Sequence, residues 1–160
     1  MEEEKITPFL WFDKEAEQAA QLYTSIFPDS RIKGVTRYDE AGAKASGVPA
    51  GTVMTVAFEL AGQSFTALNG GPLFKFTEAV SFVVGCETQA EVDAYWDKLT
   101  ANGGQPSQGG WLKDRFGLSW QIVPSSLGRL LGGPDPAKKG RVIQALLKMT
   151  KVDIKALEEA

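Results

Sequence analysis

The chain has 160 residues, enough for one compact domain with a sizeable core or for two small modules that share one. Its net charge is −3 and its basic residues are scattered, which argues against a nucleic-acid partner. The single cysteine, Cys86, excludes an intrachain disulfide, and the absence of histidine removes the commonest general base and the commonest metal ligand.

No apolar run approaches the roughly 20 residues that cross a bilayer. The first residues, Met-Glu-Glu-Glu-Lys, are acidic and lack the apolar segment of a signal peptide. We therefore expect a cytoplasmic protein that has no membrane partner.

The chain opens with an apolar run over residues 6–12 that predicts a strand, in which Pro8 favours an edge or a bulge. Asp13 is expected to cap a helix whose apolar positions recur at helical spacing until Pro28 ends it. A polar, twisted strand is predicted over residues 31–39.

Residues 41–51 are rich in Gly, Ala, Ser and Pro without periodicity, so we expect a flexible loop. Two strands follow, over residues 52–60 and 63–68, with Ala61-Gly62 as the hairpin turn between them. The first part of the chain therefore predicts a strand, a helix and three further strands.

The second part repeats this order. A strand is predicted over residues 80–86, and Thr88-Gln89-Ala90-Glu91 is a capping box that opens a second helix. Asn102-Gly103-Gly104 ends this helix. A hairpin over residues 109–124 then turns at Asp114 to Gly117. Two copies of one unit make an internal duplication the economical interpretation.

Strand alternation within the hairpin separates two faces. Leu118, Trp120 and Ile122 form an apolar face that we expect to pack on the helices, whereas Ser119, Gln121 and Val123 form a mixed face expected to line a cleft. The same alternation assigns Phe65, Ala67 and Asn69 to the cleft. Lys113 and Asp114 are interpreted as a turn that carries surface charge.

Beyond Pro124 the chain is predicted to be helical. Ser125 and Ser126 can cap a short turn that ends at Gly132-Gly133, Asp135-Pro136 starts an amphipathic helix, and Asp153 caps a last short helix. Such a tail covers either the sheet of its own chain or a second subunit.

Four ordered motifs across nearly the whole chain resemble the PhnB-like branch of the vicinal oxygen chelate superfamily. They are Ile6-Thr7-Pro8-Phe9-Leu10-Trp11-Phe12-Asp13, Tyr23-Thr24-Ser25-Ile26-Phe27-Pro28-Asp29-Ser30, Phe65-Thr66-Ala67-Leu68-Asn69-Gly70-Gly71-Pro72, and Gly110-Trp111 through Pro124.

This resemblance implies an α+β fold of paired βαβββ modules, as in glyoxalase and bleomycin-resistance proteins, whose mixed sheets curl around a cleft. We expect one domain over residues 1–160, with modules at about 5–70 and 78–124 and C-terminal helices over 125–160. The resemblance also implies a homodimer, and the amphipathic C-terminal stripe needs a surface to cover.

Metal-dependent relatives place His or Glu on the first and last strand of each module, where they hold a divalent ion. The corresponding positions here fall near Thr7 or Pro8, between Ala67 and Asn69, between Ala79 and Ser81, and at Gln121. None is an imidazole or a carboxylate, so we expect no metal and no cofactor. A methyltransferase name is attached to this branch, but no glycine-rich turn that would hold such a cofactor opens either helix.

Seven residues are candidates for ligand binding because they supply aromatic walls or polar handles on strands and turns, while no catalytic residue is assigned. They are Trp11, Glu59, Asn69, Gly70, Ser81, Trp111 and Gln121. Each also has a simpler interpretation as core aromatic, solvated carboxylate or turn residue. Cys86 is interpreted as a buried, inert thiol.

Three classes of function agree with this chain. The first is a binding protein that holds a small, partly aromatic molecule without metal, and we favour it. The second is a metal-dependent lyase, isomerase or dioxygenase, against which the missing ligands argue. The third is a dimeric protein with a vestigial cleft.

Overall fold

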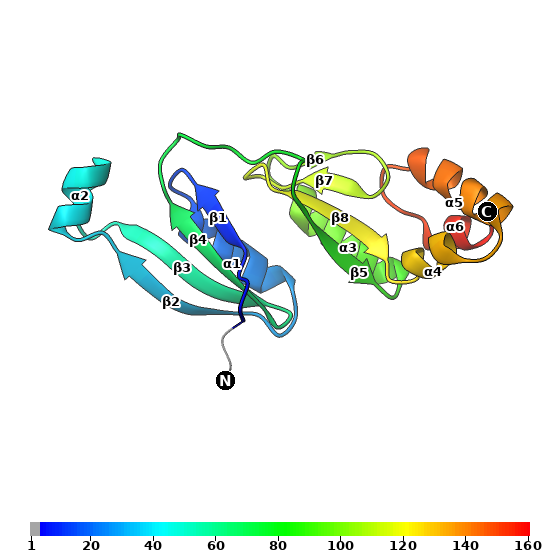
Figure 1. Ribbon diagram of the computed structural model, residues 1–160, viewed down its shortest axis with the longest axis horizontal. Coiled ribbons are helices and arrows are strands. Elements are labelled where there is room, and N and C mark those ends of the chain that lie inside the picture. The colour runs from blue at the N-terminus through cyan, green and yellow to red at the C-terminus, as the bar shows by residue number, and fades with distance from the viewer. Residues whose placement is uncertain (1–3) are drawn as a thin grey trace. The chain divides into compact units, whose positions relative to one another are not determined.

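The computed structural model describes residues 4–160, which divide into two compact units between Lys75 and Phe76 (Figure 1). Each unit contains one four-stranded sheet. Within the described residues, no helix combines the length and the apolar character needed to span a membrane.

The first unit is a βαβββ module with one extra helix. Its sheet has the order β1-β4-β3-β2, in which β1 runs parallel to β4 and the other neighbours are antiparallel. Its elements are β1 (Phe9–Phe12), α1 (Ala16–Ile26), β2 (Arg31–Arg37), α2 (Glu40–Ser46), β3 (Val53–Leu60) and β4 (Gln63–Asn69).

Helix α1 covers one face of this sheet. Val56, Phe58 and Leu60 alternate along β3 and are buried on that face, and Tyr23 of α1 is fully buried beside Phe58. Phe65 stacks on Phe58 with ring centroids 5.4 Å apart. The face of each sheet that its helix does not cover is called the open face below.

The second unit repeats the βαβββ order and adds three helices. Its sheet has the order β5-β8-β7-β6, with β5 parallel to β8 and the others antiparallel. Its elements are β5 (Ser81–Cys86), α3 (Gln89–Thr100), β6 (Gln105–Pro106), β7 (Trp111–Lys113), β8 (Ser119–Pro124), α4 (Leu127–Gly132), α5 (Pro136–Leu147) and α6 (Ile154–Glu158).

The core of this unit lies between α3 and the sheet. Trp120 and Ile122 of β8 are buried on the side of α3, where Val92, Trp96 and Leu99 form its inner stripe. The prediction that Trp120 belongs to the core is confirmed. The predicted fold class, two βαβββ modules with mixed sheets and a C-terminal helical extension, is confirmed as well, and neither sheet closes on itself.

The C-terminal helices form a core of their own around Val142, Val152 and Leu157. The side chain of Gln89 joins this segment to the start of α3. Its Nε2 donates to the carbonyl of Val152 at 2.9 Å, and its Oε1 accepts from the backbone N–H of Ile154 at 2.9 Å.

Two local predictions were wrong. Residues 41–51 were predicted to be a loop, but most of the helix α2 (Glu40–Ser46) lies there: it begins after Asp39, whose side chain accepts from the N–H of Gly42, and ends at Gly47 in the left-handed conformation. Asp13 does not cap α1, which begins after Glu15 without a side-chain cap from its own N-terminal residues.

Candidate functional site

Trp11 lies on the open face of the first sheet and is held by the segment that follows β4. Its indole N–H donates to the carbonyl of Gly71 at 2.9 Å, and its ring meets Phe74 edge-on with centroids 4.9 Å apart. A Cβ atom at Gly70 would lie 2.4 Å from the indole ring. Gly70 is therefore required by the packing of Trp11, and the indole is fixed in place.

Asn69 lies on the other face, toward α1, and is buried. Its Oδ1 accepts from the N–H of Ala16 at 2.8 Å, and its Nδ2 donates to the carbonyl of Val53 at 3.0 Å. The assignment of Phe65 and Ala67 to a cleft was wrong, since both are buried on the same side. Both polar atoms of Asn69 are thus engaged within the core of the first unit.

Glu59 lies on the open face of the first sheet with its side chain 26% exposed. Its Oε2 is 3.3 Å from Nε of Arg31, the residue opposite it on β2. The carboxylate therefore has a cationic partner at the surface and does not lie near Trp11 in the register of the sheet, which places Trp11 beside Leu68 and Glu59 beside Ser64.

The second unit brings the other three predicted residues together. Gln121 of β8 lies between Val83 of β5 and Trp111 of β7 in the register of the sheet. Its Nε2 donates to Oγ of Ser81 at 2.9 Å. Ser81, Trp111 and Gln121 therefore share one region of the open face of the second sheet.

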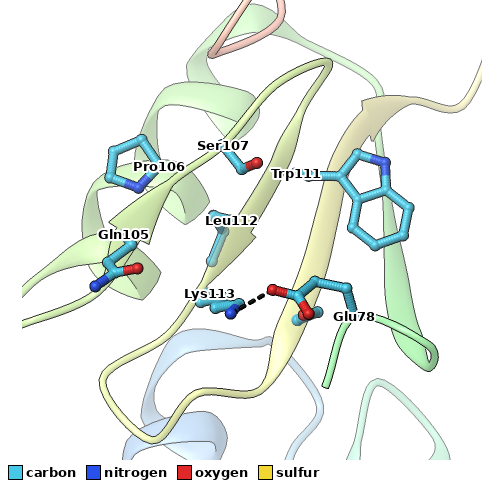
Figure 2. A pocket seen from close by; sticks show the side chains of 8 residues that line it. Glu78, Gln105, Pro106, Ser107, Trp111, Leu112 and Lys113 are labelled. Atoms are coloured by element: carbon cyan, nitrogen blue, oxygen red, sulfur yellow. Dashed lines mark ion pairs between the residues drawn. The ribbon is translucent and has the colours of Figure 1, made fainter. Parts of the chain in front are cut away.

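A cavity of about 160 Å³ lies beside this region, and Figure 2 shows the side chains around it. Trp111 is the one predicted ligand-binding residue among those that line it. Ser119 was placed by strand alternation on the face expected to line a cleft. The remaining residues were not selected from the sequence, because nothing in their spacing distinguishes them from ordinary strand and loop positions. The lining residues are Glu78, Gln105, Pro106, Ser107, Trp111, Leu112, Lys113 and Ser119.

The polar lining follows from strand register. Lys113 of β7 lies opposite Gln105 on one side and Ser119 on the other, so these three side chains form one row across β6, β7 and β8. The next row contains Ser107 and Trp111, since the N–H of Ser107 donates to the carbonyl of Trp111 at 2.8 Å. Two adjacent rows of the open face thus build the cavity.

Ser119 is the buried polar residue of this cavity. The residue is 1% exposed, and its Oγ has no hydrogen-bond partner among the described residues. A buried hydroxyl without a partner costs roughly 1–3 kcal/mol relative to a paired one. A ligand that forms a hydrogen bond with Oγ of Ser119 therefore removes this free-energy cost.

Lys113 and Glu78 form an ion pair at the rim, drawn as a dashed line in Figure 2. The hydrogen bond from Lys113 lowers the pKa of the Glu78 carboxyl. The side chain of Glu78 is 60% exposed. Exposed ion pairs of this kind contribute little stability, so a ligand can replace Glu78 at Lys113 at small cost.

Asp114 was predicted to carry surface charge, and this prediction was wrong. The residue is 2% exposed, and its carboxylate accepts from the N–H groups of Phe116 and Leu118 at 2.9 and 3.1 Å. It also accepts from the indole N–H of Trp120 at 2.9 Å. Asp114 therefore organises the hairpin that carries Lys113 and Ser119.

The donor sets do not fit a metal ion. Among residues 4–160, no three His, Cys, Asp or Glu side chains gather in a way that could hold one. At the positions that hold the metal in metal-dependent relatives, Asn69 is engaged in the core and Gln121 donates to Ser81. We therefore derive no chemical step through a metal.

Nor do the helix starts fit a nucleotide-like cofactor. The residues between β1 and α1 are Asp13, Lys14 and Glu15, and those between β5 and α3 are Glu87 and Thr88. Neither turn contains the glycines that let a backbone approach phosphate groups.

The comparisons with known proteins agree with this architecture. The profile of the family described as 3-demethylubiquinone-9 3-methyltransferase matches residues 4–123. A solved PhnB protein from Bacillus cereus, which carries the same methyltransferase name, is 38% identical over 75% of this chain and 99% of its own, with a TM-score of 0.66. The chain belongs to this family. The predicted PhnB-like branch of the vicinal oxygen chelate superfamily is thereby confirmed.

More distant structures share the fold of this PhnB-like chain. Protein PA1353 from Pseudomonas aeruginosa is 17% identical over 76% of this chain and 98% of its own, with a TM-score of 0.59. The fosfomycin resistance protein FosX from Listeria monocytogenes, solved with Mn(II) and sulfate, is 16% identical over 82% of this chain and 98% of its own, with a TM-score of 0.54. No curated protein matches the chain.

Proposed function

We propose that this PhnB-like protein binds a small organic molecule without the help of a metal ion, in the cavity on the open face of the second sheet. The observation that carries the proposal is the combination of one aromatic wall, Trp111, with several polar groups around a space of about 160 Å³. Ligand sites generally combine apolar walls with a few convergent polar groups.

The size of the cavity limits the ligand. A cavity of about 150 Å³ in a protein interior accepts one benzene molecule. The space beside Trp111 therefore suits a molecule built on a single ring or of similar bulk. Ser81 and Gln121 lie on the same open face and extend the polar surface on one side.

Of the seven predicted ligand-binding residues, three belong to the proposed site and four lie in the first unit. Trp111, Ser81 and Gln121 belong to the proposed site, whereas Trp11 and Gly70 form a fixed aromatic region of the first unit, and Glu59 and Asn69 serve the first sheet. We also propose that residues 1–160 form a single domain, that the chain assembles into a homodimer and that the protein is cytoplasmic.

A fragment screen tests the proposal directly. Amide resonances of the full-length, isotope-labelled protein are followed while monocyclic fragments are added, both charged and neutral. We expect shifts at Ser107, Trp111, Lys113 and Ser119, and we expect Trp111→Ala to abolish them. The matched control is Trp11→Ala, which removes an indole from the other unit. A screen in which no fragment shifts these resonances contradicts the proposal and favours a vestigial cleft.

Metal analysis separates this proposal from the metal-dependent alternative. We expect no stoichiometric Zn, Fe, Ni or Mn in protein purified without added metal, because nitrogen sites need His and oxygen sites need several carboxylates. One equivalent that resists mild chelation overturns the metal-free part of the proposal.

A further inference from the structure

We infer that the ligand is a small aromatic monocarboxylate, whose carboxylate is held by Lys113 and Ser119 and whose ring lies against Trp111. This inference rests on the proposed function, because it names the class of molecule that occupies the same cavity.

The first argument concerns the anionic group. Lys113 and Ser119 are direct neighbours across β7 and β8, so an ammonium group and a hydroxyl reach one point of the open face. The Oγ of Ser119 is buried and has no partner among the described residues. A carboxylate accepts from both groups at once, and charge-assisted hydrogen bonds are about twice as strong as neutral ones.

The second argument concerns the exchange with Glu78. This carboxylate pairs with Lys113 from the loop before β5, and its side chain remains 60% exposed. The pair shows that Lys113 accepts a carboxylate at this point. A ligand carboxylate that also reaches Ser119 gains a hydrogen bond from its Oγ, with which Glu78 forms no hydrogen bond.

The third argument concerns charge. Lys113 is the single cationic residue that lines the cavity, and Glu78 is the single anionic one. A dianion such as a phosphate monoester would place its second negative charge beside Glu78 without a second cation. The lining therefore favours one negative charge on the ligand.

The fourth argument concerns length. Trp111 and Lys113 are two residues apart on β7, and their side chains share the open face. Residues at this spacing lie ~7 Å apart along a strand. A benzene ring that bears one carboxylate spans this distance, so the ring meets the indole while the carboxylate reaches Lys113.

The test compares benzoate with benzamide, which has nearly the same shape and no charge. Both are titrated into the full-length protein, and the amide and indole resonances of Ser107, Trp111, Lys113 and Ser119 are followed. We expect benzoate to bind at least about tenfold more tightly than benzamide, and we expect added salt to weaken benzoate binding alone. Equal affinities for the two compounds overturn the inference.

Two variants test which residues bind the carboxylate of benzoate. We expect Lys113→Met to lower benzoate affinity about tenfold and to leave benzamide affinity unchanged, and Ser119→Ala to lower benzoate affinity by about fivefold. The matched control is Lys151→Met, which removes the lysine of another exposed ion pair, with Asp93 at 3.0 Å. Equal benzoate affinities of Lys113→Met and Lys151→Met also overturn the inference. Because Lys113 is a surface residue, its variant carries the test should Ser119→Ala fail to fold.

The outcomes separate this inference from the proposed function. Neutral fragments that shift the same resonances, without a preference for benzoate, overturn the carboxylate assignment and leave the binding function supported. A protein in which neither benzoate nor any neutral fragment shifts these resonances contradicts both.

Discussion

Asp114 shows at the scale of one residue how the hairpin of the candidate site is fixed. The sequence predicted the turn from Asp114 to Gly117, and the N–H of Gly117 indeed donates to the carbonyl of Asp114 at 2.9 Å. The burial of the carboxylate was not predictable, because it depends on the indole of Trp120, which reaches it from the far strand of the hairpin.

We expect Asp114→Ala to lower the free energy of unfolding by about 3 kcal/mol, because three donors, two of them in buried hydrogen bonds, lose their acceptor together. Urea denaturation measures the change. The matched control is Asp97→Ala, an exposed aspartate of α3 for which we expect a change within about 0.5 kcal/mol. A loss at Asp114 no larger than that at Asp97 contradicts a structural role for the carboxylate.

Cys86 is the second residue whose environment gives a measurable consequence. It is 1% exposed, and burial raises the pKa of its thiol from the ordinary 9.0 to about 11, with Glu91 and Glu87 adding to the shift. The folded protein therefore holds the thiol proton more tightly than the unfolded chain. The resulting stability is complete below pH 9.0 and is lost as the pH rises toward about 11.

We expect the free energy of unfolding of the natural chain to fall more steeply over this alkaline range than that of Cys86→Ala. Lys151 also has a raised pKa, but its causes do not involve Cys86. The Cys86 charge adds to the raised pKa of Tyr95, so the difference between the two curves reports the thiol together with its coupling to Tyr95. Urea denaturation at several pH values supplies the curves. Parallel curves would show that the thiol does not titrate differently in the folded state.

At the scale of elements, the starts of the helices divide into those that local sequence determines and those that it does not. Thr88, Asp135 and Asp153 cap α3, α5 and α6 as predicted, because each bonds an N–H two or three residues later. The start of α1 instead receives the side chain of Asn69, 53 residues away, so Asp13 was the wrong choice. This cap comes from the last residue of β4, so the sequence around α1 does not reveal it.

The attachment of the C-terminal helices depends on Gln89. We expect Gln89→Ala to reduce the hydrogen-exchange protection of the Ile154 and Leu157 amides by about tenfold or more, because two hydrogen bonds of about 1 kcal/mol each are lost. Amides of β8 should keep their protection. The control is Gln21→Ala, an exposed glutamine of α1. Unchanged protection at Ile154 would contradict the role of Gln89.

At the scale of the whole molecule, the order of elements could be predicted and the candidate site only in part. Hydrophobic periodicity and turn residues predicted a strand, a helix and three strands in the first part and a strand, a helix and a hairpin in the second, while the short strand β6 was not predicted. The paired βαβββ fold was implied by the family resemblance, and it was confirmed. Gln121 was selected by strand alternation, Trp111 as an aromatic wall and Ser81 from the family resemblance, and the three lie together. Ser119 was placed on the face expected to line a cleft. Lys113 and Glu78 were missed, because their proximity to it follows from the pairing of β6, β7 and β8 and from the path of the loop before β5, which a single sequence does not display.

The edges of the two sheets bear on assembly. Strand β2, at one edge of the first sheet, carries Arg31, Lys33 and Arg37, and such charges protect an edge from pairing with another chain. Strand β5, at one edge of the second sheet, has the sequence Ser-Phe-Val-Val-Gly-Cys without any charge. Several large apolar side chains also remain exposed among the described residues, Leu73, Phe74, Val80 and Val83 among them.

An uncharged edge and exposed apolar side chains are surfaces that proteins normally cover. We therefore expect a two-fold symmetric homodimer, since closed dimers are the commonest way for a chain to cover its own surface. Light scattering coupled to size-exclusion chromatography should give twice the monomer mass of 17.3 kDa at micromolar concentration. High salt should not dissociate the dimer, because apolar contacts strengthen with excluded salts while exposed ion pairs weaken. A mass of 17.3 kDa throughout a dilution series would show that these surfaces stay uncovered in the isolated chain.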